Sequence, residues 1–413
     1  MTQFTDLDLS EPIQRALAQE GYTTPTEIQA RSIPALLDGR DVMGCAQTGT
    51  GKTAAFLLPV LQYLSEERPP RGKRPIRALI LTPTRELAAQ IGASATAYGR
   101  FLSLKHTVIF GGTGEGNQIR ALRSGLDLLV ATPGRLLDLM GRGFIDLRSV
   151  EFFVLDEADR MLDMGFIHDV RRVVERLPED RQNLLFSATL DPKVTKLAAS
   201  FLYKPLSVNV TPVVTSVEKI DQTVMFVEKA NKRFLLIKLL KGEGVESVIV
   251  FTRTKHGANR LTKQLNAAGI EAGAIHGNKS QGARTRTLNS FRAGDLTVLV
   301  ATDLASRGLD VEHVTHVFNY ELPNEPASYV HRIGRTGRAG RSGIAISFCD
   351  ADERDYLRDI YREIGQSIPV DDTHEYHSNA APIPPPVRGR GQAGGRGRDG
   401  GQSRGGRGGG RGR

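Results

Sequence analysis

A glycine-rich segment near the N-terminus has residue types that suit it to holding phosphate. Residues 46–53 (Ala46-Gln-Thr-Gly-Thr-Gly-Lys-Thr53) match the pattern G-x-x-x-x-G-K-[ST], except that alanine takes the first glycine position. The glycines let backbone N–H groups wrap a phosphate chain, the lysine can reach its terminal oxygens, and the last threonine can ligate Mg²⁺. A chance match is the alternative. We predict that a nucleotide's phosphates are bound by Ala46, Gln47, Thr48, Gly49, Thr50, Gly51, Lys52 and Thr53.

Acidic residues follow an apolar run farther along the chain, in Phe152-Phe-Val-Leu-Asp-Glu-Ala-Asp159. A carboxylate at the end of a strand can hold the Mg²⁺ that the phosphates also ligate. We assign Asp156 to the metal and Glu157 to orienting and deprotonating the attacking water. Taken alone, acids after a strand more often belong to a solvated turn or to the N-terminus of a helix. The phosphate loop upstream favours the catalytic assignment, with Lys52, Asp156 and Glu157 as catalytic residues.

Two sets of apolar runs, separated by amphipathic stretches of helical length, must position these groups. Apolar runs that alternate with helices are typical of parallel sheets covered on both faces. The pattern predicts an α/β fold with two tandem domains. The runs are 78–82, 126–131, 152–156 and 184–187 in the first half, and 247–251, 297–301, 314–319 and 345–348 in the second.

Composition marks the ends of these domains. The 413 residues exceed the usual size of one core, and residues 208–219 follow neither helical nor strand periodicity, which indicates a linker. After residue 371 the chain becomes polar, then proline-rich, then Arg/Gly-rich, which predicts a disordered tail. The expected parts are residues 1–30, a first domain at 31–207, the linker, a second domain at 220–371 and a tail at 372–413.

The charge distribution points to an anionic partner. The net charge is +9, and residues 388–413 hold eight arginines and one aspartate, so that segment carries +7 and the rest about +2. No apolar run is long enough to span a bilayer, and the first residues lack the features of a secretory signal. Cys45 and Cys349 form no disulfide or metal pattern. We expect a cytoplasmic protein with no membrane association.

The segment Asp156-Glu-Ala-Asp159 resembles the motif of the DEAD-box ATP-dependent RNA helicases, and the resemblance extends over residues 1–370. It implies two RecA-like domains, with ATP and Mg²⁺ as cofactors. The segment from Gly21 to Gln29 is similar to the family's adenine-reading motif, with Phe4 as the upstream aromatic residue, Tyr22 able to stack on the ring, and the Gln29 amide able to read its edge. Outside the family context, Gln29 would be an ordinary surface residue.

The resemblance also assigns residues that couple hydrolysis to strand separation and residues that complete the ATP site. Ser187 and Thr189 are expected to hydrogen-bond the acids of the 156–159 segment; without this context, Ser187-Ala-Thr189 would be a helix N-cap. Residues 331–338 are similar to the family's arginine-finger motif, although a basic surface loop is the alternative. The expected coupling residues are Ser187, Thr189, Asp159 and His331, the fingers are Arg335 and Arg338, and the ribose contact is Asp310.

The remaining motifs resemble the family's RNA contacts. Hydroxyl groups, glycine amides and arginines suit phosphate and sugar, so they would position a strand without reading its bases. A Thr-Pro-Gly-Arg segment is more often a simple turn. The expected contacts are Pro83, Thr84, Arg85, Gly112, Thr132, Pro133, Gly134, Arg135, Arg253, Gln281, Arg284 and Thr302.

Together these motifs imply RNA-stimulated ATP hydrolysis with local opening of short RNA duplexes or remodelling of RNA–protein complexes. The short body and basic tail resemble the bacterial RhlE-like branch of the family. We expect a monomer, with ribosomal precursor particles or RNA-degradation machinery as partners. An ATP-dependent RNA clamp and a DNA translocase are the alternatives; the intact catalytic set disfavours the first, and the DEAD tetrad disfavours the second.

Overall fold

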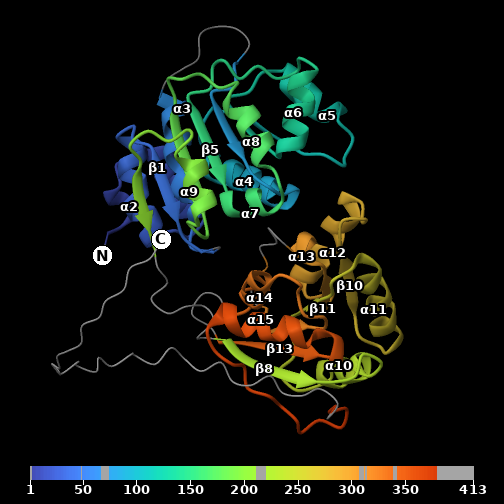
Figure 1. The fold of residues 1–413 in the computed structure, drawn as a ribbon. Coiled ribbons are helices and arrows are strands. Elements are labelled where there is room, and N and C mark those ends of the chain that lie inside the picture. Colours follow the sequence, from blue (N-terminus) through green and yellow to red (C-terminus); the bar gives the residue numbers. More distant parts are fainter. Residues whose placement is uncertain are drawn as a thin grey trace, which may run out of the picture.

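The protein folds into two α/β domains, each built on one parallel sheet (Figure 1). The computed structural model describes residues 2–47, 49–66, 74–210, 220–306, 311, 314–337 and 342–378. The first sheet has seven strands in the order β3-β4-β2-β5-β6-β1-β7, and the second has six in the order β10-β11-β9-β12-β13-β8. All strand pairs within these sheets are parallel. The prediction of two tandem RecA-like domains is therefore confirmed.

The strands are short, as expected for sheets of this class. Those of the first domain are β1 (Val42–Cys45), β2 (Ala78–Leu81), β3 (His106–Ile109), β4 (Leu128–Ala131), β5 (Phe152–Asp156), β6 (Gln182–Ser187) and β7 (Leu206–Asn209). Those of the second are β8 (Ile220–Phe226), β9 (Val248–Phe251), β10 (Ala272–Ile275), β11 (Val298–Ala301), β12 (His316–Asn319) and β13 (Gly343–Cys349).

Helices cover both faces of each sheet. The first domain has α1 (Glu11–Gln19), α2 (Glu27–Leu37), α3 (Lys52–Glu66), α4 (Arg85–Tyr98), α5 (Gly116–Arg123), α6 (Pro133–Gly141), α7 (Ala158–Asp163), α8 (Ile167–Val174) and α9 (Pro192–Ala198). The second has α10 (Lys232–Leu240), α11 (Lys255–Ala267), α12 (Gln281–Ala293), α13 (Asp303–Ser306), α14 (Pro326–Ile333) and α15 (Arg354–Ile364), and short 3₁₀ turns lie at Phe4–Asp6 and Ala351–Glu353. None of the helices in these described ranges is both long and apolar enough to cross a membrane.

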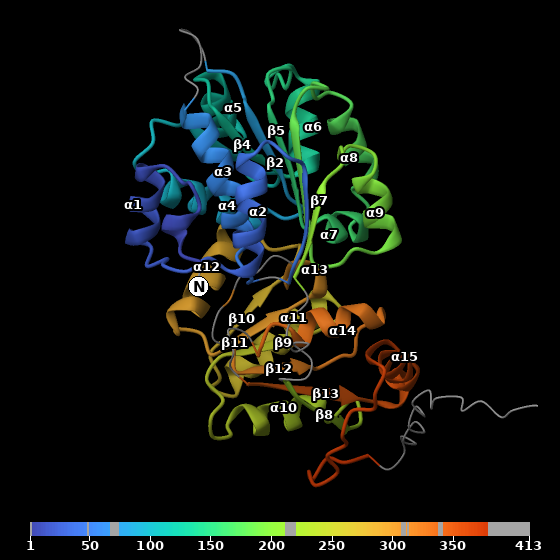
Figure 2. The same cartoon turned by 90° about the vertical axis from the view of Figure 1, so that its left-hand side faces the viewer.

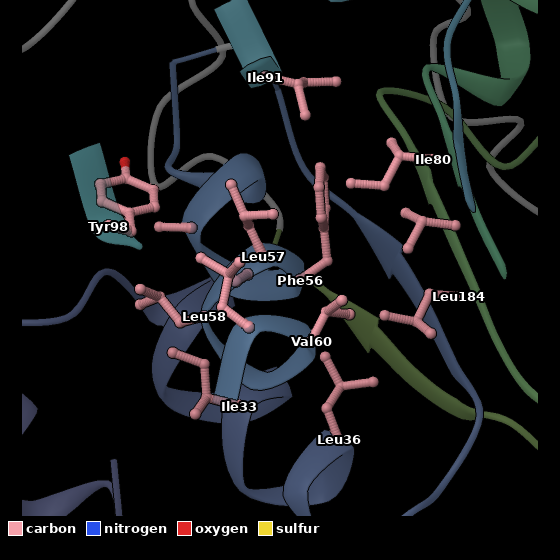
Figure 3. Close-up of a cluster of buried hydrophobic side chains, with 14 of the residues drawn as sticks. Ile33, Leu36, Phe56, Leu57, Leu58, Val60, Ile80, Ile91, Tyr98 and Leu184 are labelled. Atoms are coloured by element: carbon pink, nitrogen blue, oxygen red, sulfur yellow. The ribbon is translucent and has the colours of Figure 1, made fainter. Parts of the chain in front are cut away.

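The core fixes the helix that follows the phosphate loop. Most of α3 is buried, and its Phe56 ring lies 5.3 Å from the Phe186 ring of β6. Figure 3 shows Phe56 and Val60 among side chains from the neighbouring strands and helices, including Ile80, Ile91 and Leu184. Because α3 is held along its length, its first residue, Lys52, has a defined place at the carboxyl edge of the sheet.

The domain boundaries in the structure differ from those predicted. The boundary between residues 30 and 31 falls inside α2, and Phe4 and Ile13 are buried in the same core as α3, so the N-terminal segment is part of the first domain. Strand β7 pairs with β1 and ends at Asn209, so the first two residues of the 208–219 linker belong to the first sheet. Residues 211–219 lie outside the described part.

The predicted tail also begins later than residue 372. Val224 bridges Val370, Val227 bridges His377, and the N–H of Ser378 donates to the carbonyl of Phe226 at 3.1 Å. The chain therefore lies along β8 as far as residue 378. The backbone hydrogen bonds of this segment explain why its polar composition does not prevent an ordered path. The predicted disorder of 379–413 concerns residues outside the described part.

Candidate functional site

The sequence motifs gather at the carboxyl edge of the first sheet because all of its strands run in one direction. The neighbouring strands β5, β6 and β1 are followed by the acids, by Ser187-Ala-Thr189 and by the phosphate loop. The neighbouring strands β3, β4 and β2 are followed by the segments expected to contact RNA. The sheet order thus separates the predicted nucleotide-binding residues from the predicted RNA contacts, at the edge where open α/β sheets bind ligands.

The phosphate loop curls between β1 and α3. Gly49 and Gly51 have φ values of +87° and +88°, a region that residues with side chains rarely adopt. Lys52 is 7% exposed, and its Nζ donates to the Ala46 carbonyl at 2.5 Å. The Thr50 hydroxyl donates to the carbonyl of Gln47 at 2.7 Å. This local geometry follows the predicted loop; Thr48 lies outside the described residues.

Gln29 is tied to that loop. Its amide nitrogen donates to the carbonyl of Gly51 at 3.1 Å, and its amide oxygen accepts from the N–H of Thr26 at 2.8 Å. The second bond belongs to a capping box that starts α2. The amide nitrogen and the amide oxygen of Gln29 can each form one further hydrogen bond, which could be made with the edge of a base.

The predicted aromatic residues lie together beside Gln29's helix. The Phe4 and Tyr22 rings are 6.3 Å apart and nearly parallel, and the Tyr22 hydroxyl is 3.4 Å from that of Tyr98. Phe4 is buried, whereas Tyr22 is 41% exposed. The arrangement therefore leaves Tyr22 accessible for stacking and gives Phe4 a supporting position.

The two predicted catalytic acids end β5. Asp156 is 2% exposed, and one of its oxygens accepts from the N–H of Glu157 at 3.0 Å. Burial, and then the neighbouring Glu157 carboxylate, raise the pKa of Asp156 to about 7, while Lys52 opposes the shift. Hard oxygen donors of this kind, a carboxylate and the hydroxyl of Thr53, suit Mg²⁺. The cation's charge would also relieve the unfavourable burial of the carboxylate.

Glu157 occupies an unusual backbone conformation and has a partner that the sequence reasoning missed. Its φ and ψ are 52° and 53°, and its side chain lies 2.6 Å from the guanidinium of Arg160. Both side chains are at most 6% exposed. The spacing of three residues could have indicated this pair, because residues i and i+3 are neighbours on a helix.

Asp159 links the ends of β5 and β6. Its Oδ2 accepts from the N–H groups of Ala188 and Thr189, both at 3.1 Å, and from the Thr189 hydroxyl at 3.4 Å. The Ser187 hydroxyl instead accepts from the N–H of Asp159 at 3.2 Å. The structure thus brings together Asp159, Ser187 and Thr189 as expected, although only Thr189 donates a hydroxyl to the carboxylate.

The second domain contributes a basic segment at the end of α14. Arg335 is 6% exposed and its Nε donates to the carbonyl of His331 at 3.3 Å. Thr302, 9% exposed, lies between β11 and α13. Arg338 and Asp310 lie outside the described residues.

Arg332 was not predicted as a site residue, yet it organises this region. Its guanidinium donates to both carboxylate oxygens of Asp303, at 2.5 and 2.7 Å, and to Asn319 and the carbonyl of Glu321. The group lies 5.0 Å from the Phe251 ring centre. The hydrogen bonds join α14 to the segments that follow β11 and β12, and the ring contact joins it to the end of β9, so that together they place His331 and Arg335.

The first domain's predicted RNA contacts lie on helix starts and loops. Thr84 caps α4 by accepting from Leu87, and Pro133 and Gly134 form the first turn of α6 after Thr132. Arg85 lies close against Gly112. A Cβ atom on residue 112 would lie only 2.1 Å from the Arg85 guanidinium, so only glycine leaves the guanidinium in this place. Arg135 donates to Gln118 at 3.3 Å. Pro83 is buried in the segment between β2 and α4.

The structure joins two second-domain residues to this face through Glu86. Gln281 Nε2 donates to Glu86 Oε1 at 3.2 Å, and Arg284 Nη2 lies 2.8 Å from the same oxygen. Figure 2 shows α12, which begins at Gln281, at the boundary between the domains. Arg253 is paired within its own domain instead, with Glu353 at 3.2 Å.

Two family models match the chain. The model described as DEAD/DEAH box helicase matches residues 26–197, and the helicase conserved C-terminal domain matches residues 231–340. The chain is 41% identical to an ATP-dependent RNA helicase RhlB of Shewanella baltica, over 94% of this chain and 89% of that protein.

Other similar proteins include longer ones. The chain is 45% identical to the ATP-dependent RNA helicase DeaD of Mycobacterium tuberculosis over 88% of its own length, and spans 64% of that relative's length. Among solved structures, S. cerevisiae Dbp5 bound to RNA and ADP BeF3 matches with a TM-score of 0.78 and 34% identity, over 90% of this chain and 95% of that one.

Proposed function

Because the chain belongs to the DEAD/DEAH box helicase family, we propose that it is an ATP-dependent RNA helicase that opens short duplexes locally or remodels RNA–protein complexes. The observation that carries the proposal is the placement of Lys52, Asp156 and Glu157 at the carboxyl edge of the first sheet, after β1 and β5, the two strands that pair with β6; all three residues are buried there. Such convergence of a cation and two acids suits phosphoryl transfer to water.

In this proposal each ATP group has its own contacts. Residues 46–53 bind the phosphates, Gln29 and Tyr22 bind adenine with Phe4 in support, and Asp310 binds the ribose. Thr53 and Asp156 hold Mg²⁺, which neutralises phosphate charge when bound. Glu157 orients the attacking water and accepts its proton, and Arg335 and Arg338 supply positive charge from the second domain.

RNA is proposed to bridge the domains through its backbone. The first-domain contacts are Pro83, Thr84, Arg85, Gly112 and Thr132 to Arg135, and the second-domain contacts are Arg253, Gln281, Arg284 and Thr302. Asp159, Ser187, Thr189 and His331 couple the two sites. The interdomain bonds of Glu86 support a role for α12 at this face, and the Arg/Gly tail would add salt-sensitive affinity.

We further propose an RhlE-like helicase that acts as a cytoplasmic monomer, on ribosomal precursor particles or with RNA-degradation machinery. Its domains would comprise residues 1–209 and 220–378. The basic tail of eight arginines supports an RNA-rich environment.

The test compares ATP hydrolysis with matched RNA and DNA single strands of equal length and sequence. We expect RNA to stimulate kcat strongly and DNA weakly. Equal stimulation would remove the RNA assignment and favour a DNA translocase. Duplex capture on ATP without turnover would favour an RNA clamp.

A further inference from the structure

The buried ion pair between Glu157 and Arg160 involves a residue with an unusual backbone conformation. The described chain has three non-glycine residues with positive φ, Asp8, Glu157 and Lys204, and of these Glu157 alone is buried. A left-handed conformation is unfavourable for a residue with a side chain, and it persists where surrounding contacts hold it. The backbone of Glu157 is held by its N–H, which donates to Asp156, and by its carbonyl, which accepts from the N–H of Met161. Its side chain is held by the Arg160 guanidinium, 2.6 Å from Oε2.

The pair is buried, so its charges act strongly on their surroundings. The Glu157 and Arg160 side chains are 6% and 5% exposed. The adjacent Asp156 carboxylate repels Glu157, and Arg160 opposes that repulsion as the cation bonded to Glu157. The backbone N–H of Arg160 also donates to Asp159 Oδ1 at 2.9 Å. Arg160 is thus connected to both the water-activating acid and the coupling acid.

A general base must present one oxygen to its water in a fixed direction. The guanidinium bonds Oε2 and thereby restricts rotation of the carboxylate, which also fixes the position of Oε1. We propose that Arg160 is a positioning residue that holds the Glu157 carboxylate in its working orientation. The inference rests on the proposed function, because it presumes that Glu157 activates water.

Arg160→Met removes the charge and the hydrogen bond while keeping a long apolar chain. We expect kcat for RNA-stimulated ATP hydrolysis, measured with a poly(U) strand, to fall by about 10- to 100-fold, because misplacing a reacting group by about 1 Å costs about that much. The KM for ATP should stay within about twofold, because Arg160 contacts no phosphate-loop residue in the described structure. Arg160→Lys keeps the charge and should recover part of kcat.

A double-mutant cycle separates positioning from a general structural effect. In a Glu157→Gln background, Arg160→Met should change kcat by less than about twofold, since the residue through which it acts is already disabled. Equal losses in both backgrounds would overturn the proposal, as would an unchanged kcat in the single variant. Arg172→Met is the matched control: Arg172 pairs with Asp169 three residues earlier, but its side chain is 66% exposed, so kcat should be unchanged.

The outcomes distinguish this inference from the proposed function. If the parent protein shows no RNA-stimulated hydrolysis, or if Glu157→Gln hydrolyses ATP at the parent rate, the proposed function or the role of Glu157 fails. If Glu157→Gln is slow but Arg160→Met is as fast as the parent, only the positioning role fails. Should Arg160→Met lose ADP binding through misfolding, Arg160→Lys with intact ADP affinity decides: a lowered kcat supports positioning, and the parent rate overturns it.

Discussion

Asp159 offers a sharp test of how the first domain is held together at the segment proposed to couple hydrolysis to strand opening. Its carboxylate accepts from three backbone N–H groups, those of Arg160 at 2.9 Å and of Ala188 and Thr189 at 3.1 Å. A hydrogen bond to a charged group contributes about 1.5–3 kcal/mol net. Because Thr189 is exposed and its amide can be hydrated again, we expect Asp159→Ala to lower the free energy of unfolding by about 3–5 kcal/mol.

Asp159→Asn keeps one carbonyl oxygen, which can still face Ala188 and Thr189, and places an NH₂ group against the N–H of Arg160. We therefore expect a smaller loss, about 1–2 kcal/mol. The chain has no tryptophan, so urea unfolding is followed by far-ultraviolet circular dichroism of the first-domain transition. The number of short RNA duplexes opened per ATP hydrolysed should fall in both variants.

Asp191→Ala is the matched control. Asp191 caps α9 by accepting from Val194 at 2.8 Å, is exposed, and lies beyond the coupling segment. Losing this cap should cost about 1 kcal/mol and leave duplexes opened per ATP unchanged. If Asp159→Ala loses no more stability than Asp191→Ala, or if the Asn and Ala variants are equal, the carboxylate is not what joins the ends of β5 and β6.

The remaining predictions concern single groups. Glu157→Gln should still bind ATP and RNA but hydrolyse ATP slowly, and rapid single turnovers would remove Glu157 from its proposed role. Arg335→Ala and Arg338→Ala should keep ATP affinity within a few fold while losing kcat, as expected for contacts made mainly in the transition state; an equal loss of affinity and rate would indicate a structural role. Deleting residues 388–413 should flatten the slope of log affinity against log salt for a single strand of RNA, and an unchanged slope would make the tail a bystander. Burial raises the pKa of the Cys349 thiol to about 12, so the thiolate fraction at pH 8 is about 10⁻⁴ and iodoacetamide should label it in the native protein only as the pH rises; rapid labelling at pH 8 would contradict the buried position.

Much of the fold could be predicted because buried parallel strands are continuous apolar runs. The runs at 78–82, 152–156 and 247–251 each correspond to a strand. Strands β1 and β3 were among those missed: Val-Met-Gly-Cys contains a glycine and no β-branched residue after the valine, and His-Thr-Val-Ile mixes polar with apolar residues. Their pairing depends on neighbours far along the chain, which local periodicity does not encode.

The ends of the domains were less predictable for a related reason. Residues 372–378 read as a solvated tail, yet Tyr376 stacks near Phe234 of α10 and Glu375 pairs with Lys238 at 3.0 Å. These contacts exist only once α10 is packed. Composition predicts how much apolar surface a segment can bury, but it does not predict a partner surface supplied by another element.

The site also combines motifs that depend on neighbouring residues with contacts that depend on segments far apart in the sequence. Backbone geometry at Gly49, Gly51 and the end of β5 follows from residue types within a few positions, so the phosphate loop and the acids could be located directly. The groups that orient them could not: Arg332 depends on Asp303 and Asn319 from other strands' ends, and Glu86 meets Arg284 from a different domain. These orienting residues contact other helices and strands, whereas the reacting groups lie at the ends of their own strands. A substitution in an orienting residue should therefore change the rate of ATP hydrolysis and the number of duplexes opened per ATP more than it changes nucleotide affinity. The Asp159 variants test this separation, because the Asp159 carboxylate bonds Ala188 and Thr189 beyond the end of β6.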